Sequence, residues 1–297
     1  MILKIEQFKK DSPQASVILP ISKGESSPHF HRLIKELSRQ SFQDFEILLA
    51  SEIEPNGRAR NEAVRQAKGN ILFLIDETTS LGHERILENL LKPFAKEPQR
   101  KIGMTGASIL PHQPLKSFQR QYFMMRDFYA PVVKELTPSW KVQHPCMAIP
   151  TSVFKEVGGE SDCLITGTDN DLRQRVAAAG YEMLLVPETW GYYLPPDSLK
   201  EILQKGWRKG KGSAYALLMF PGLFEFGNFF GVCISHPVVA LFYTALSALI
   251  KVLNPKYWFN PVALLYSCAS FLGFIEGWFH WIGSKPFEDR SDLPWRQ

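Results

Sequence analysis

The segment GGESDCLITGTDNDL, residues 158–172, is the most informative part of this sequence. It contains two adjacent glycines and, ten residues after the second, the carboxylates Asp169 and Asp171, which open a basic segment that we expect to be helical. Taken alone, the pattern favours a structural interpretation. Thr168, three residues before Asp171, forms a pattern like a capping box, and carboxylates at a helix start complement the helix dipole. The rest of the chain decides whether these carboxylates have a further role.

Length and composition limit the class of protein. The 297 residues can form one large domain with an appendage, and 45% hydrophobic residues are sufficient for a buried core. The net charge of +4 is too small to indicate nucleic-acid binding by itself, and we expect no nucleic-acid partner. The four cysteines are far apart and form no C-x-x-C pair, so we expect reduced thiols rather than a zinc site.

The first two thirds of the chain alternates apolar, strand-like runs with helix-like segments, which predicts an α/β sheet covered by helices on both sides. The run at residues 70–76 is apolar almost throughout, as is typical of a strand covered on both faces. Pro28 and Gly69 mark a helix start and a helix end. The predicted strands are residues 16–20, 45–50, 70–76, 101–110, 146–150 and 182–187, and the predicted helices start at residue 28 and span residues 61–68 and 83–96.

In open α/β sheets, ligands bind beyond the carboxyl ends of the strands. In this chain the residues there are 20–23, 51–52 and 76–78, together with the loop before Asp169. These residues are the first candidates for a functional site.

Seven segments, in order, resemble motifs of family 2 glycosyltransferases, the inverting sugar transferases with a GT-A fold. The segment at residues 158–180 resembles the family block GGFDE…GEDxDLxxR…aGY. The other six are SVILP (16–20), FQDFEI (42–47), GRARN (57–61), AKGN (67–70), LIDET (74–78) and VFKEVGG (153–159). The resemblance covers most of residues 15–212 and implies a GT-A, Rossmann-like mixed sheet.

The resemblance also implies roles for individual residues. Asp169 matches the family's general base, which takes the proton of an acceptor hydroxyl as that hydroxyl attacks the anomeric carbon of the sugar. Asp171 would orient the helix start or the acceptor. The residues expected to contact or shape the nucleotide-sugar site, with a UDP-hexose as the expected donor, are Pro20, Ser22, Glu52, Arg60, Asn61 and Asp76.

The sequence departs from the family pattern at the DxD motif, whose carboxylates hold a divalent cation at the donor diphosphate. The first Asp is present as Asp76, but Thr78 stands at the third position, and Ser51 or Glu52 stands where the family has an Asp that contacts uracil. A hydroxyl is a weak ligand, so we expect at most weak binding of Mg²⁺ or Mn²⁺ by Asp76 and Thr78. Alternatively, Asp76 only caps the turn that follows its strand.

Residues 192–208 look like a segment of exopolysaccharide glycosyltransferases of the succinoglycan type, which places Trp207 and Arg208 on the acceptor or phosphate side. The helix expected there is basic, so it could bind a diphosphate of the donor or of a lipid-linked acceptor. Alternatively, it is a solvated face beside anionic lipid headgroups. Its cationic residues are Lys200, Lys205, Arg208, Lys209 and Lys211.

The last third contains two uncharged runs, residues 226–250 and 257–275, each close to the ~20 residues that a bilayer-spanning helix needs. We expect about two transmembrane or re-entrant helices within residues 213–285, with an interfacial stretch at 213–224 and a polar tail at 286–297. The alternative is a pair of buried core helices. Residues 1–14 are polar and charged, so we expect no signal peptide and a cytoplasmic catalytic domain at the inner membrane.

Together these expectations describe a membrane-associated glycosyltransferase that transfers a hexose, with inversion, from a nucleotide sugar to a lipid-linked or envelope saccharide, as in exopolysaccharide biosynthesis. The alternative is a catalytically weakened or non-catalytic relative with the same fold, which serves as a binding or scaffold subunit. The missing carboxylates at Thr78 and Ser51 favour that alternative.

Overall fold

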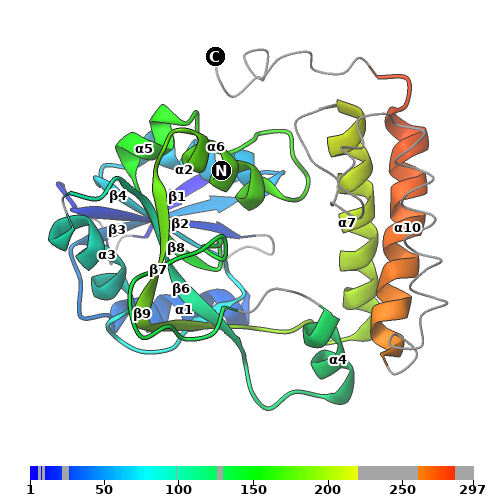
Figure 1. Cartoon of the computed structure of the whole chain (residues 1–297), viewed down its shortest axis with the longest axis horizontal. Helices are drawn as coiled ribbons and strands as arrows, with labels where there is room; N and C mark the ends of the chain where they lie inside the picture. The colour runs from blue at the N-terminus through cyan, green and yellow to red at the C-terminus, as the bar shows by residue number, and fades with distance from the viewer. Residues whose placement is uncertain are drawn as a thin grey trace. The chain divides into compact units, whose positions relative to one another are not determined.

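The computed structural model describes residues 1–5, 8, 11–21, 27–97, 99–125, 130–219 and 260–284 (Figure 1). The chain divides into two compact units. Unit 1 comprises Met1–Pro114, Phe128–Cys163 and Gly167–Pro195, and unit 2 comprises Leu115–Asp127, Leu164–Thr166 and Pro196–Gln297. The predicted domain at residues 15–212 therefore includes parts of both units.

Unit 1 is built on a mixed sheet with the strand order β1-β3-β2-β4-β8-β6-β9-β5, and β7 pairs with β9. β2 is parallel to both β3 and β4, and β6 is parallel to β9, whereas the other pairs are antiparallel. The predicted mixed α/β class is confirmed. The strands are β1 (Ile2–Lys4), β2 (Ala15–Ile21), β3 (Phe45–Ser51), β4 (Ile71–Ile75), β5 (Thr79–Leu81), β6 (Ile102–Pro111), β7 (Thr137–Pro138), β8 (Cys146–Pro150) and β9 (Glu182–Tyr193).

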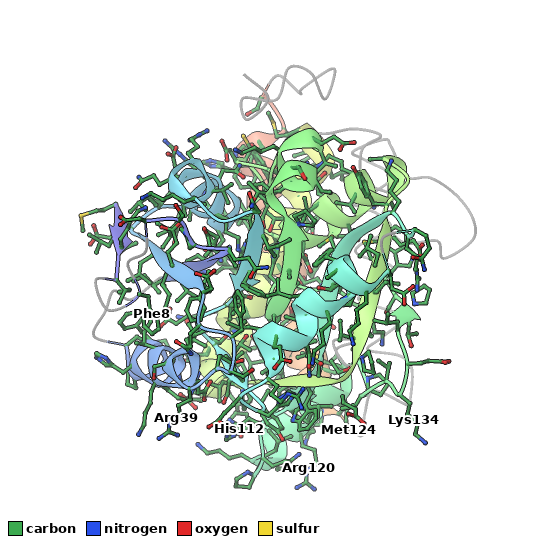
Figure 2. All side chains as sticks on the ribbon, turned by 90° about the vertical axis from the view of Figure 1, so that its left-hand side faces the viewer. Phe8, Arg39, His112, Arg120, Met124 and Lys134 are labelled. Carbon is green, nitrogen blue, oxygen red and sulfur yellow. The ribbon has the colours of Figure 1, made fainter. Side chains whose placement is uncertain are left out.

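Helices cover both faces of the sheet because the central strands are apolar on both faces. Along β2, Val17 and Leu19 pack with α1 (Pro28–Ser38) and α3 (Ile86–Lys96) in one buried cluster, which also contains the stacked rings of Phe8 and Phe45. Phe8 is labelled in Figure 2. Ile18 lies in a second cluster on the opposite face. That cluster includes residues of α2 (Asn56–Gln66), α5 (Thr151–Glu156) and α6 (Thr168–Ala178).

Several predicted boundaries are wrong. The helix predicted at residues 61–68 begins five residues earlier and ends at Gln66, because residues 67–70 turn into β4. The helix predicted from residue 83 begins at Ile86. The strand predicted at residues 182–187 continues to Tyr193 as the long β9. The strand predicted at residues 146–150 is found with the same bounds, as β8.

Unit 2 contains α4 (Ser117–Met125), α7 (Leu199–Met219) and α10 (Pro261–Trp281). Residues 213–219 of the predicted interfacial stretch continue α7 without interruption, and residues 220–224 lie outside the described residues. Among the described residues, α10 is the helix that is long and apolar enough to cross a membrane. The uncharged run at residues 226–250 and the tail at residues 286–297 lie outside the described residues.

α7 and α10 pack with their backbones very close together. A Cβ atom built on Gly210 would lie 1.7 Å from the carbonyl oxygen of Ser270, and one built on Gly273 would lie 2.1 Å from that of Trp207. Such short distances are possible only because glycine has no side chain. The two glycines therefore fix how closely these helices approach each other.

Candidate active site

Three of the residues predicted at the donor site, Pro20, Glu52 and Asp76, lie at one edge of the sheet of unit 1. β2, β3 and β4 are parallel, so their carboxyl ends share that edge. Pro20 is buried within β2, Glu52 is exposed directly after β3, and Asp76 is half-buried directly after β4. Ser22 lies outside the described residues.

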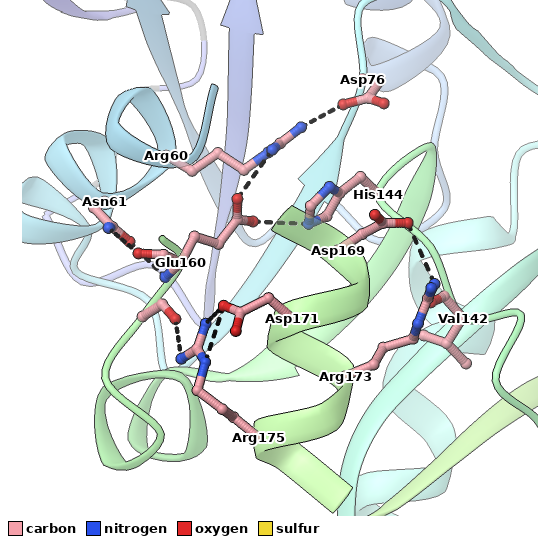
Figure 3. Close-up of polar contacts among 11 residues, drawn as sticks. Arg60, Asn61, Asp76, Val142, His144, Glu160, Asp169, Asp171, Arg173 and Arg175 are labelled. Carbon is pink, nitrogen blue, oxygen red and sulfur yellow. Dashed lines mark hydrogen bonds and ion pairs between the residues drawn. The ribbon is translucent and has the colours of Figure 1, made fainter. Parts of the chain in front are cut away.

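Asp76 pairs with Arg60, a buried residue of α2 (Figure 3). Nη2 of Arg60 donates to Oδ1 of Asp76 at 2.5 Å, and Nη1 donates to Oε2 of Glu160 at 3.1 Å. The guanidinium thus bridges two carboxylates. On the far side of Glu160, Nε2 of His144 lies 2.8 Å from Oε1, which is ion-pair distance without the alignment of a hydrogen bond. Arg60, Glu160 and His144 are only 1%, 0% and 6% exposed.

The charges of this buried group stabilise one another. Burial would by itself raise the pKa of Glu160, but the charge of Arg60 and then that of His144 lower this pKa to about 2. Burial would likewise lower the pKa of Arg60, but Glu160 and Asp76 raise it above its usual value. Arg60 and Glu160 therefore both remain charged in the folded protein at neutral pH.

Asn61, the next residue of α2, holds the main chain of the segment that follows the double glycine. Its Nδ2 donates to the carbonyl oxygen of Glu160 at 2.7 Å, and its Oδ1 accepts from the backbone N–H of Glu160 at 2.9 Å. Nδ2 also lies 2.5 Å from Oδ1 of Asp162. Both ends of the amide are therefore engaged by the protein itself. Asn61 therefore holds residues 160–162 against α2.

The capping-box interpretation of the start of α6 is wrong. The N-cap residue is Gly167, in the left-handed conformation with φ of 82°, and no side chain caps the helix. Thr168 is the first helical residue. The carboxylates Asp169 and Asp171 do lie in the first turn, where they complement the helix dipole.

The two carboxylates of α6 have different surroundings. Asp171 is buried and accepts from Nε of Arg175 at 3.0 Å, while Nη1 of Arg175 donates to the carbonyl oxygens of Val157 and Gly159. Asp171 therefore ties α6 to the turn before Glu160. Asp169 is 31% exposed, and its Oδ2 lies 3.3 Å from Nη1 of Arg173.

The residues near Asp76 offer few ligands for a metal ion. One oxygen of Asp76 is already bonded to Arg60, and half-buried Thr78 adds a neutral hydroxyl. Within the part of the chain that the structure describes, no group of three or more His, Cys, Asp or Glu side chains could hold a metal ion. These residues fit a cation only if a further ligand, such as a diphosphate, supplies most of the coordination.

The residues predicted on the acceptor side lie on α7 in unit 2. Trp207 is half-buried and Arg208 is exposed. One turn further along, Lys211 lies over the ring of Trp207 with Nζ 5.0 Å from the ring centroid, and it pairs with Glu276 of α10 at 2.9 Å. Lys211 thus connects the basic part of α7 to α10.

Three polar residues of the site were not predicted. Glu160 lies inside the segment of residues 158–172, and the signal that could have identified it was an acidic residue directly after two glycines. Arg32 of α1 donates to the carbonyl oxygen of Thr79 at 3.0 Å and so holds the turn that carries Asp76. His144 follows no recognisable motif, and only the fold brings it to Glu160.

Comparisons with known proteins agree with this fold. No family model matches the chain. Over 181 residues the chain is 24% identical to the glycosyltransferase AglE of Haloferax volcanii, a match that covers 60% of this chain and 58% of AglE. The chain thus spans less than two thirds of the length of this curated relative.

Two solved structures are similar at low sequence identity. The mannosyltransferase PcManGT from Pyrobaculum calidifontis, in complex with GDP-Man and Mn²⁺, has a TM-score of 0.52 at 13% identity, covering 89% of this chain and 87% of that one. The S. aureus protein TarS, residues 1–349, has a TM-score of 0.45 at 14% identity, covering 90% of this chain and 91% of that one. The likeness to PcManGT shows that this chain shares the fold of that mannosyltransferase.

Proposed function

We propose that this chain is a family 2-like glycosyltransferase that transfers a hexose from a nucleotide sugar to a saccharide acceptor with inversion at the anomeric carbon. The observation that carries the proposal is the placement of two accessible carboxylates in unit 1, each held by an arginine. Asp76 follows β4 and is held by Arg60, and Asp169 opens α6 and is held by Arg173. The likeness to AglE supports the same class of reaction.

In this proposal Asp169 is the general base. Its carboxylate takes the proton of the acceptor hydroxyl while the hydroxyl oxygen forms a bond to the anomeric carbon. The bond from that carbon to the diphosphate oxygen breaks, and the nucleoside diphosphate leaves. The contact with Arg173 fixes one oxygen of Asp169, and partial exposure leaves the carboxylate accessible. Asp171, which is buried against Arg175, orients the helix start.

The donor would lie at the carboxyl ends of β2, β3 and β4, against Pro20, Ser22, Glu52 and Asp76. Arg60 would supply positive charge there, and Asn61 would shape the site indirectly, since both ends of its amide are bonded to residues 160–162. A UDP-hexose is the proposed donor. GDP-mannose is the second candidate because PcManGT was solved with GDP-Man.

A divalent cation would bind weakly and only together with the nucleotide. When bound, Mg²⁺ or Mn²⁺ would neutralise charge on the leaving diphosphate. Asp76 is the main candidate ligand and Thr78 a weaker one. PcManGT was solved with Mn²⁺, which makes this cation the first choice for a test.

The acceptor is proposed to be lipid-linked, with the catalytic unit on the cytoplasmic side of the inner membrane and a role in exopolysaccharide or envelope synthesis. α10 supports membrane association, because Leu265, Leu272 and Phe279 are 46%, 62% and 70% exposed and lie seven residues apart. The basic residues of α7, Arg208 among them, would then contact lipid or acceptor phosphates together with Trp207.

A thermal-shift screen of UDP-hexoses and GDP-mannose, with and without Mn²⁺ or Mg²⁺, tests donor binding, because a ligand of the native state raises the unfolding temperature. We expect stabilisation by one nucleotide sugar, and release of its nucleoside diphosphate when a saccharide acceptor is added. Stabilisation without any release, across all acceptors tried, would favour the non-catalytic binding or scaffold subunit.

A further inference from the structure

Arg60, Glu160 and His144 form a buried group next to Asp76. The carboxylate of Glu160 is held at more points than it would need merely to balance the charge of Arg60. Glu160 is fully buried and has a different side chain at each carboxylate oxygen, Arg60 at Oε2 and His144 at Oε1. Its backbone is held at both polar groups by Asn61. The position of this carboxylate is therefore determined from three directions, by α2, by the loop before β8 and by its own main chain (Figure 3).

The fixed carboxylate determines where Arg60 points. A guanidinium has a rigid planar fork of donors, so fixing Nη1 on Glu160 also fixes the direction of Nη2, which lies on Asp76. Without the charge of Glu160, Asp76 would be the one carboxylate among the described residues that pairs with Arg60. The guanidinium would then be free to rotate toward Asp76 and take both of its oxygens.

We infer that Glu160 is a positioning residue, which sets the orientation of Arg60 so that Asp76 keeps one oxygen available to a nucleoside diphosphate or its cation. The inference rests on the proposed function for what binds at Asp76. It concerns a residue whose own carboxylate is fully buried and contacts only Arg60 and His144 among the described residues.

The test is a double-mutant cycle read by calorimetry, with UDP and with GDP as probes in the presence of Mn²⁺. Glu160→Gln should weaken binding by about tenfold in the native background and by less than about twofold in an Asp76→Asn background, because its effect passes through Asp76. Equal losses in the two backgrounds would show that Glu160 acts only as a structural counterion and would overturn the inference.

Glu46→Gln is the matched control. Glu46 is 2% exposed, accepts from Ser16 Oγ at 2.8 Å and from the backbone N–H of Lys68 at 2.7 Å, and pairs with Lys4 at 3.0 Å. It is a buried, paired glutamate of unit 1 with no contact to Asp76 or Arg60. We expect its substitution to change nucleotide affinity by less than about twofold. A loss as large as that of Glu160→Gln would count against a positioning role.

A second readout needs no nucleotide. The guanidinium NMR signals of Arg60 should be those of a rotationally restrained group in the native protein and should average in Glu160→Gln, and unchanged signals would contradict the inference.

If neither probe binds the native protein, the proposed function fails while this measurement still decides on positioning. If Glu160→Gln does not fold, His144→Gln takes its place in the cycle, where coupling to Asp76 supports the inference and additivity overturns it.

Discussion

At the scale of single residues, Asp169 and Asp171 are two positions apart on α6 but differ in accessibility. Asp171 is buried against Arg175, whereas the side chain of Asp169 is 31% exposed and contacts Arg173 through one oxygen. Asp169→Asn should lower turnover by ~10²-fold or more and leave nucleotide-sugar affinity nearly intact, because a base acts on the acceptor proton in the transition state. Steady-state kinetics together with donor binding by calorimetry check this.

Glu62→Gln is the control for that substitution. Glu62 is a partly exposed carboxylate on α2 that pairs with Arg65 three residues further on, and it has no place in the proposed site. Its loss should leave turnover unchanged. Near-native turnover of Asp169→Asn would instead mean that Asp169 is not the base and only complements the dipole of α6.

Glu160 predicts how stability depends on pH. Its folded pKa of about 2 lies below the usual value of 4.5, so its contribution is present above the unfolded pKa and is lost as the pH falls toward 2. The shift corresponds to about 3 kcal/mol. The unfolding temperature of the native protein should therefore exceed that of Glu160→Gln most at pH 5–7, and the difference should shrink between pH 5 and 2. Circular dichroism melts across this range measure it, and a constant difference would contradict the assigned pairing with Arg60.

The charged group also shows what could be predicted of the site. The motif GRARN predicted Arg60 and Asn61 as residues that shape the donor pocket, and in the structure Arg60 pairs with Asp76. Glu160 was missed because its role depends on meeting Arg60, which lies 100 positions earlier in the chain. His144 was missed because its role depends on meeting Glu160, and no local pattern records either contact.

At the scale of elements, the interior strands β2, β3, β4 and β8 were predicted to within about a residue at each end, because a strand covered on both faces is a short continuous apolar run. β1, β5 and β7 have only two or three residues each and exist through pairing with β3 and β9. The prediction ended β9 too early, at Pro187, because proline usually ends a strand. Pairing that depends on partners distant in sequence has no local signal.

The contact between α7 and α10 makes a separate prediction. Gly210→Ala should destabilise unit 2 by ~1–3 kcal/mol, because its Cβ would lie 1.7 Å from the carbonyl oxygen of Ser270, and this overpacking exceeds the gain of ~1 kcal/mol in helix propensity. Thermal melts of the full chain in detergent, followed by the helical signal, measure the change. Gly283→Ala is the control, since nothing lies within 4 Å of its Cβ position. Equal melting of both variants would mean that α7 and α10 do not pack through these glycines.

At the scale of the whole molecule, the proposed membrane association predicts that the full chain stays with membranes after a carbonate wash. The mostly exposed apolar face of α10 is the described part of the chain that supports this. Truncation at Lys211 would not be a clean control, because it divides α7. The appropriate comparison is a peripheral protein of the same membranes, which the wash should release. Recovery of the full chain in the soluble fraction without detergent would show that α10 is a core helix and would remove the main physical support for a lipid-linked acceptor.

The bridge from Arg60 to Glu160 also has a kinetic consequence, because it closes a loop of 100 residues. Contacts of such long range form late, after the intervening strands have condensed, since loop closure costs entropy before the contact rewards it. Glu160→Gln should therefore accelerate unfolding in denaturant and leave the rate of refolding nearly unchanged, which stopped-flow measurements can separate. An equal slowing of refolding would mean that the bridge is already present in the transition state. If it does form late, the bridge sets the lifetime of folded unit 1 through the unfolding rate and leaves the folding rate unchanged.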